Sequence, residues 1–144
     1  MKEPSPSPQE WAAAWLRNSY ERTTKAFWAW EDLTDAAYDD PERAWQVILQ
    51  LVRDAQPDRY GYIGAGPLKH LIRAHAQAFI DRIEAQAASD PRFREELGQV
   101  SVNTLEHRPE IVARLVAASG GVIEPYALDY DEAERKYLRD QDGA

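Results

Sequence analysis

The chain has 144 residues, 44% of them hydrophobic, contains no cysteine and carries a formal net charge of −8. This length and composition predict one folded domain with its own core, without disulfides or thiolate ligands for zinc. The acidic charge argues against nucleic-acid binding, and the lack of a long apolar run argues against a membrane span, so we expect a cytoplasmic protein.

The N-terminal part predicts two helices after a mobile leader at residues 1–6. Ser7 is a suitable N-cap for the first helix, with Pro8 at its first position. Its inward residues are predicted to be Trp11, Trp15, Leu16 and Ser19. The second helix is expected to begin at Thr23 or Thr24 and to end near Tyr38. Its predicted inward stripe is Phe27, Trp30, Leu33, Thr34 and Ala37.

A third and a fourth helix are predicted on either side of a glycine-rich connection at residues 56–66. The third begins at Asp40-Pro41, ends near Ala55, and has Ala44, Trp45, Ile48, Leu51 and Val52 inward. The fourth begins at Pro67 and runs to about residue 88, with the stripe Leu68, Leu71, Ile72, His75, Phe79, Ile83 and Ala87. We expect a shared core of Trp45, Leu71, Ile72, Phe79 and Ile83.

The C-terminal part predicts shorter elements. A fifth helix from Pro91 to about Gly98 buries Phe93 and Leu97, and residues 99–107 are expected to be irregular. A sixth helix begins at Pro109 and is closed by Gly120-Gly121; residues 122–128 are expected to be extended or looped, and a polar helix begins at Asp129 or Asp131. The prediction is therefore an all-α single domain over residues 7–140, with a short tail at 141–144. Its six or seven helices pack as antiparallel pairs, in a bundle or a helical-repeat-like stack.

Three motifs resemble an uncharacterised family of small, all-helical bacterial proteins. The motifs are Asp40, Pro41, Ala44 and Trp45; Gly64, Gly66, Pro67 and Leu68; and Ile83, Glu84, Ala87, Asp90, Pro91, Phe93 and Arg94. The resemblance covers roughly residues 27–98 and implies a helical fold without implying an activity. At the position after Pro-Leu, where the family has a carboxylate, this chain has Lys69.

The glycine-rich turn is a candidate anion site. Gly61-x4-Gly66 resembles the start of a phosphate-binding loop, but Pro67 replaces the lysine that such a loop requires. The start of a helix can still hold an anion, and the candidate residues are Gly64, Gly66, Lys69 and His70. The alternative, which we favour, is that the two glycines only allow a sharp turn and close packing.

The histidines and paired carboxylates do not predict catalysis. His70 and His75 are five residues apart and point about 140° apart on a helix, so they are poorly placed to share a metal ion. We expect His75 in the core and His70 on the polar face. The carboxylate pairs, such as Glu95 with Glu96, suit solvated helix faces. No cofactor motif, metal motif or nucleophile motif occurs.

One side of the second helix is the candidate partner-binding site. Trp28 points about 160° away from Trp30, toward the side that holds Glu31, Asp32, Asp35 and Asp39. An indole among carboxylates is typical of an interaction hot spot for a basic partner. The alternative is that another helix, such as residues 109–119, covers Trp28.

The sequence therefore favours a non-enzymatic protein that binds another macromolecule, most plausibly a protein, through this acidic surface. An immunity- or antitoxin-like role is the most concrete form, by analogy. The alternative is a small-ligand or anion-binding protein, or a hydrolase, that uses the glycine-rich turn. The sequence does not decide between a monomer and a homo-oligomer.

Overall fold

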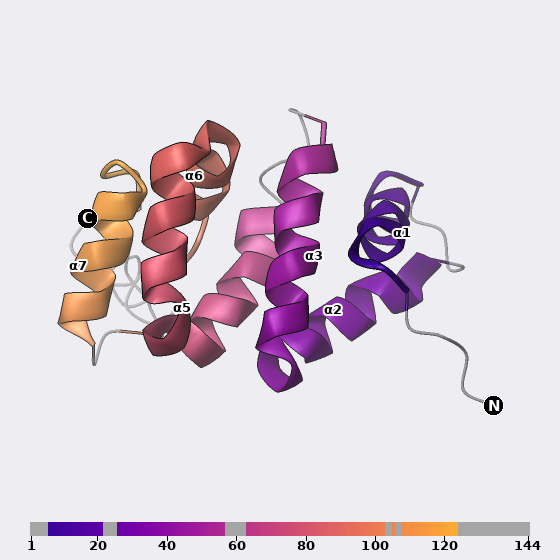
Figure 1. Cartoon of the computed structure of the whole chain (residues 1–144), viewed down its shortest axis with the longest axis horizontal. Helices are drawn as coiled ribbons and strands as arrows, with labels where there is room; N and C mark the ends of the chain where they lie inside the picture. The colour runs from indigo at the N-terminus through magenta and orange to yellow at the C-terminus, as the bar shows by residue number, and fades with distance from the viewer. Residues whose placement is uncertain (1–5, 22–25, 57–62, 103–104, 106–107, 124–144) are drawn as a thin grey trace, which may run out of the picture.

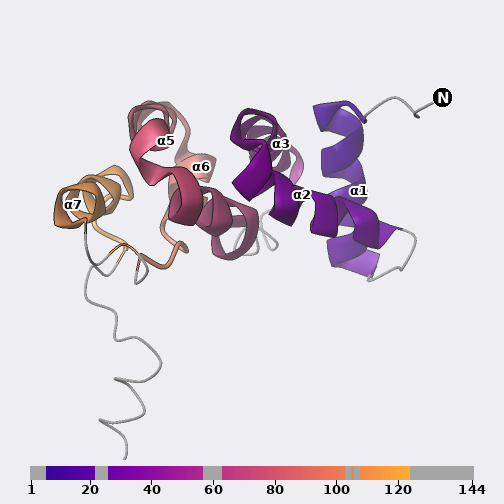
Figure 2. The ribbon, with the colours of Figure 1, turned by 90° about the horizontal axis from the view of Figure 1, so that it is seen from below.

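The computed structural model describes residues 6–21, 26–56, 63–102, 105 and 108–123, and within these ranges every regular element is a helix. The elements are α1 (Pro8–Glu21), α2 (Phe27–Asp39), α3 (Pro41–Asp54), the π-helical turn η3 (Gly64–Leu68), α5 (Lys69–Ser89), α6 (Pro91–Leu97) and α7 (Pro109–Ala118). Helices α1 and α7 lie at opposite ends of the long axis, with α3 and α5 between them (Figures 1 and 2). The all-α prediction is confirmed.

Several helix ends form as the sequence predicts. The Ser7 and Asp90 side chains each accept a hydrogen bond from a backbone N–H in the first turn of α1 and α6, at 3.1 and 3.0 Å. After α7, Gly120 and Gly121 adopt φ values of 73° and 83°. Glycine takes this left-handed conformation without a steric penalty, so the pair ends the helix.

The predicted core is confirmed. Trp45, Leu71, Ile72, Phe79 and Ile83 are all buried in one cluster. The Trp45 ring lies 5.7 Å from Phe79 and 5.6 Å from Phe93, measured between ring centroids. Because these rings come from α3, α5 and α6, the cluster joins the two halves of the chain.

The predicted inward stripe of α2 is partly wrong. Leu33 and Ala37 are buried, but Phe27 and Trp30 are 48% and 43% exposed, and Thr34 is only partly buried. The buried residues of this helix are Ala29, Leu33, Ala36 and Ala37. Three of these are alanines, whose small side chains let neighbouring helices approach closely. Trp11 of α1 even donates its indole N–H to the backbone carbonyl of Ala29, at 3.0 Å.

The helical path begins before Pro67, which corrects the predicted start of the fourth helix. Residues 64–68 form a π-helical turn that continues directly into α5. The Lys69 N–H donates to the carbonyl of Gly64, five residues back. Pro67 has no N–H to donate, so the usual hydrogen bond to the carbonyl four residues back cannot form, and the wider turn accommodates this loss.

The two histidines of α5 both contact the end of α2. The Tyr38 hydroxyl lies 2.8 Å from His70 Nδ1, and His75 Nε2 lies 2.8 Å from the Tyr38 carbonyl oxygen. Since a carbonyl only accepts, His75 Nε2 is the donor, and it satisfies one of the last carbonyls of α2. His75 is hydrogen-bonded as predicted but only partly buried, and its φ and ψ of −137° and 26° kink α5. His70 is half-buried rather than on an open polar face.

Some predictions fall outside the described residues. These are most of the leader, the start of the second helix at Thr23 or Thr24, residues 124–128, the last polar helix and the tail. Val100 and Val102 are buried, in a stretch that is neither helix nor strand. None of the helices in the described ranges combines the length and apolar character that a membrane span requires.

Candidate functional site

Helix α2 presents an exposed tryptophan among exposed carboxylates. Trp28 is 40% exposed, so the alternative that another helix covers it is wrong. Glu31, Asp32, Asp35 and Asp39 are exposed as well. At 100° per residue, these five side chains fall within about 100° of arc around α2. We call them the acidic face of α2.

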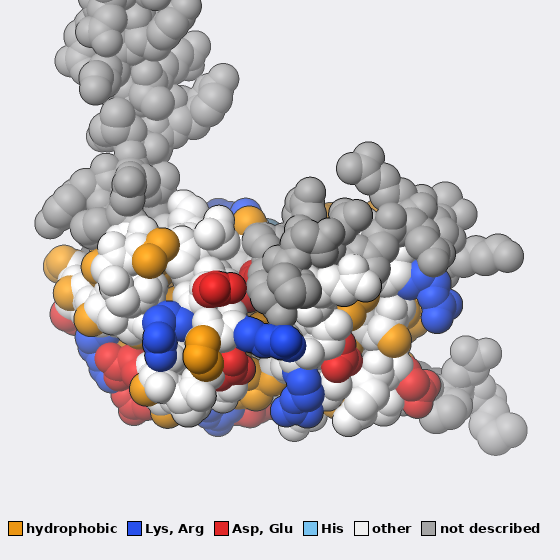
Figure 3. Space-filling model, turned by 90° about the horizontal axis from the view of Figure 1, so that it is seen from above, with side chains coloured by type: hydrophobic (Ala, Val, Ile, Leu, Met, Phe, Trp, Pro, Cys, Tyr) orange, Lys and Arg blue, Asp and Glu red, His pale blue; other side chains and the backbone are white. Residues whose placement is uncertain are grey.

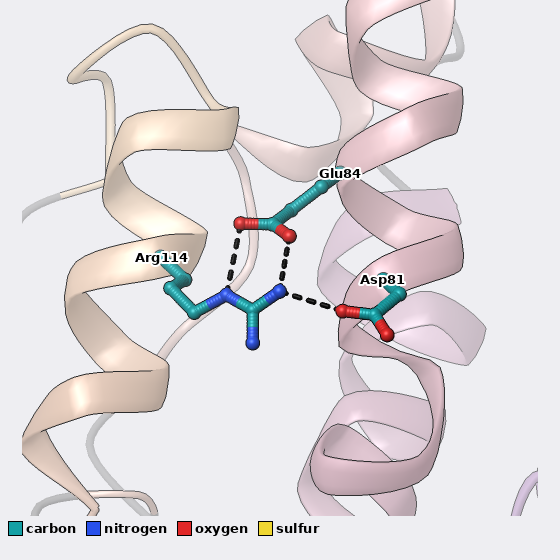
Figure 4. A network of polar contacts seen from close by, with 3 residues as sticks. All are labelled: Asp81, Glu84 and Arg114. Atoms are coloured by element: carbon teal, nitrogen blue, oxygen red, sulfur yellow. Dashed lines mark hydrogen bonds and ion pairs between the residues drawn. The ribbon is translucent and has the colours of Figure 1, made fainter.

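The carboxylates of this face differ in their pairing from Glu42, Asp81 and Glu84. In the part of the chain that the structure describes, none of the four forms an ion pair. Three acidic residues elsewhere are paired. Glu42 accepts two hydrogen bonds from Arg82, at 2.6 and 2.7 Å. The α5 carboxylates Asp81 and Glu84 both bind Arg114 of α7 (Figure 4). The acidic face of α2 therefore combines four carboxylates that have no such cationic partner among the described residues.

A small cavity of about 270 Å³ adjoins the acidic face, between α1, α2 and α3. Asp32, Asp35 and Asp40 line it, and Arg43 is the basic side chain among its described lining residues. The Arg43 guanidinium is already occupied, since it donates to the Pro6 carbonyl at 2.8 Å and lies over the Trp11 ring. Figure 3 shows the molecule from above, a view in which basic and acidic side chains are interspersed.

A larger pocket of about 470 Å³ lies on another side of α2. Its lining comes from α1, α2 and the η3–α5 junction: Trp15, Asn18, Ser19, Trp30, Thr34, Ala65, Gly66, Pro67, Lys69 and His70. The structure therefore brings together three of the four residues predicted to hold an anion. The fourth, Gly64, does not line the pocket.

The described lining of this pocket is positively charged. No Asp or Glu lies among the described lining residues, and Lys69 forms no ion pair with any of the residues that the structure describes. Burial, followed by the charges of Lys69 and Arg73, lowers the pKa of His70 below its usual value, so its imidazole is neutral at pH 7. Lys69 is thus the cationic group that the pocket offers.

Gly64 is instead required for packing against α6. Its N–H donates to the carboxyl of Glu96 at 2.6 Å, and a Cβ at this position would lie 1.9 Å from the Glu96 carbonyl oxygen. Glu96 is fully buried, and burial raises its pKa to about 8. The prediction that Glu96 lies on a solvated helix face is wrong. The overlooked signal was its spacing from Phe93, which puts it on the apolar side of a short helix.

Among the described residues, no group of His, Asp or Glu side chains could hold a metal ion. A family model described as "Family of unknown function (DUF6869)" matches residues 17–122 of the chain. No curated protein and no solved structure matches the chain. The comparisons therefore assign a family without an activity.

Proposed function

We propose that this chain, which belongs to that family of unknown function, is a non-enzymatic binding protein that docks a basic partner protein on the acidic face of α2. The observation that supports this is the combination of an exposed Trp28 with four exposed carboxylates that have no ion pair within the described residues. Its most concrete form is an immunity- or antitoxin-like role, in which an acidic surface neutralises a basic protein.

The two parts of the face have different physical roles in this proposal. An indole is large and rigid, so covering it gives much apolar contact for little loss of side-chain entropy, as is typical of hot spots. The carboxylates attract a basic partner over several ångströms and accelerate its association. Because Debye screening shortens this range, added salt lowers the association rate.

Two tryptophans of α2 provide a matched pair of variants. Trp28 and Trp30 have nearly equal exposure, 40% and 43%, but lie on different sides of the helix. The partner is first isolated from the native host and identified by mass spectrometry. Its affinity for the wild type, Trp28→Ala and Trp30→Ala is then measured by calorimetry. We expect Trp28→Ala to weaken binding by more than about 2 kcal/mol, or roughly 30-fold, and Trp30→Ala to change it little.

The charge contribution is tested on the same complex. Asp35→Asn combined with Asp39→Asn is expected to slow association and to reduce its dependence on salt, with an unchanged melting temperature. An acidic partner, or equal losses of affinity from Trp28→Ala and Trp30→Ala, would rule out this face as the docking site.

A further inference from the structure

The pocket beside Trp30 combines a flat apolar wall with the ammonium group of Lys69, which has no ion pair among the described residues. Trp15 and Trp30 line it from α1 and α2, and Lys69 lines it from the start of α5. We infer that this pocket binds a small planar monocarboxylate, with its ring against the indole of Trp30 and its carboxylate at Lys69. This inference concerns a side of α2 other than the acidic face and does not depend on the proposed protein partner.

The shape of the pocket fits a small molecule. Its volume of about 470 Å³ lies within the range of about 300–1,000 Å³ that is typical of small-ligand sites. The Trp30 ring stacks on Phe27 with ring centroids 5.5 Å apart and an interplanar angle of 24°, so Phe27 supports the indole from one side. A preformed aromatic wall favours a planar, unsaturated ring over a flexible chain.

The charge of the described lining residues matches an anion with a single negative charge. Lys69 has no carboxylate partner among the described residues, although the chain as a whole carries a net charge of −8. His70 adds no second positive charge, because its pKa is lowered and its Nδ1 is engaged with the Tyr38 hydroxyl. One ammonium group matches a carboxylate better than a phosphate dianion, for which proteins usually provide several cationic or N–H donors.

The remaining polar groups can orient the ligand. Thr34 already donates its hydroxyl to the Trp30 carbonyl at 3.0 Å, so it is engaged within α2. In contrast, the side chains of Asn18 and Ser19 form no hydrogen bond with another described residue. They are therefore available for a hydroxyl or amide on the ligand ring, at the α1 side of the pocket.

The test compares naphthoate with naphthamide, which has the same ring and nearly the same shape but no charge. Calorimetry with the wild-type protein is expected to show naphthoate binding at least tenfold more tightly than naphthamide and than inorganic phosphate. Equal affinities for the acid and the amide, or phosphate binding as tight as naphthoate, would overturn the inference. An absence of naphthoate binding would overturn it as well.

Variants then locate the site. Lys69→Gln is expected to weaken naphthoate binding about tenfold. Arg73→Gln also removes one positive charge, one helical turn later. Because Arg73 does not line the pocket, this change should weaken naphthoate binding less than about threefold. Trp30→Leu should weaken binding several-fold while Trp28→Leu leaves it unchanged. Equal effects within either pair would place naphthoate elsewhere on the protein.

Discussion

The buried carboxyl of Glu96 gives the protein a pH-dependent stability. One of its oxygens accepts from the Gly64 N–H, and the other has no hydrogen-bond partner among the described residues. Burial raises its pKa from 4.5 to about 8, and the neighbouring charge of Glu95 adds to this effect. Since the folded state binds the proton more tightly than the unfolded state, the free energy of unfolding falls as the pH rises from about 4.5 to about 8.

We therefore predict that Glu96→Gln removes this pH dependence. The amide keeps an oxygen for the Gly64 N–H but cannot ionise, so at pH 9 the variant should be more stable than the wild type by roughly 5 kcal/mol. At pH 4 the two proteins should have similar stability. Urea unfolding at both pH values measures the difference, with Glu31→Gln, at an exposed carboxylate of α2, as the control. Parallel pH profiles for the wild type and Glu96→Gln would show that Glu96 ionises normally in the folded state.

At the scale of the elements, the contact between η3 and α6 depends on a single glycine. A Cβ at Gly64 would overlap the backbone of Glu96, whereas a Cβ at Gly66 would meet no atom within 4 Å. We predict that Gly64→Ala destabilises the protein by about 3 kcal/mol, because backbone atoms must move apart. Gly66→Ala should be neutral or stabilising by up to about 1 kcal/mol. Thermal unfolding of the two variants tests the prediction, and equal melting temperatures would contradict the close approach.

The helix boundaries were predictable wherever a local signal controls them. A cap residue followed by proline marks the beginning of α1, α3 and α6, and two glycines follow the end of α7. The predicted helix start at Pro67 was wrong because a proline is also tolerated inside a π-helical turn. The orientation of α2 was missed because large aromatics were assigned inward, whereas close packing of neighbouring helices buries Ala29 and Ala36 instead.

Across the molecule, the acidic face of α2 could be predicted from the sequence, but the complete lining of the pocket could not. The acidic face lies on one helix, so helical periodicity alone places Trp28 beside Asp32 and Asp35. The pocket forms where α1, α2 and the η3–α5 junction meet. Local sequence patterns do not predict which helices are neighbours in the fold. Sequence reasoning thus identified Gly66, Lys69 and His70 but could not pair them with Trp30.

The aromatic contacts of Phe79 connect the helices of the two halves. Its buried ring packs against Trp45 of α3, and the guanidinium of Arg82 lies over it at 4.7 Å from the ring centroid. We predict that Phe79→Ala costs about 3–5 kcal/mol, because a cavity opens where α3, α5 and α6 meet. For a chain of this length, the melting temperature should fall by roughly 10 °C or more. Gln77→Ala, at an exposed position of the same helix, controls for changes in α5 itself and should shift the melting temperature little. A fall below about 3 °C for Phe79→Ala would mean that this ring does not hold the two halves together.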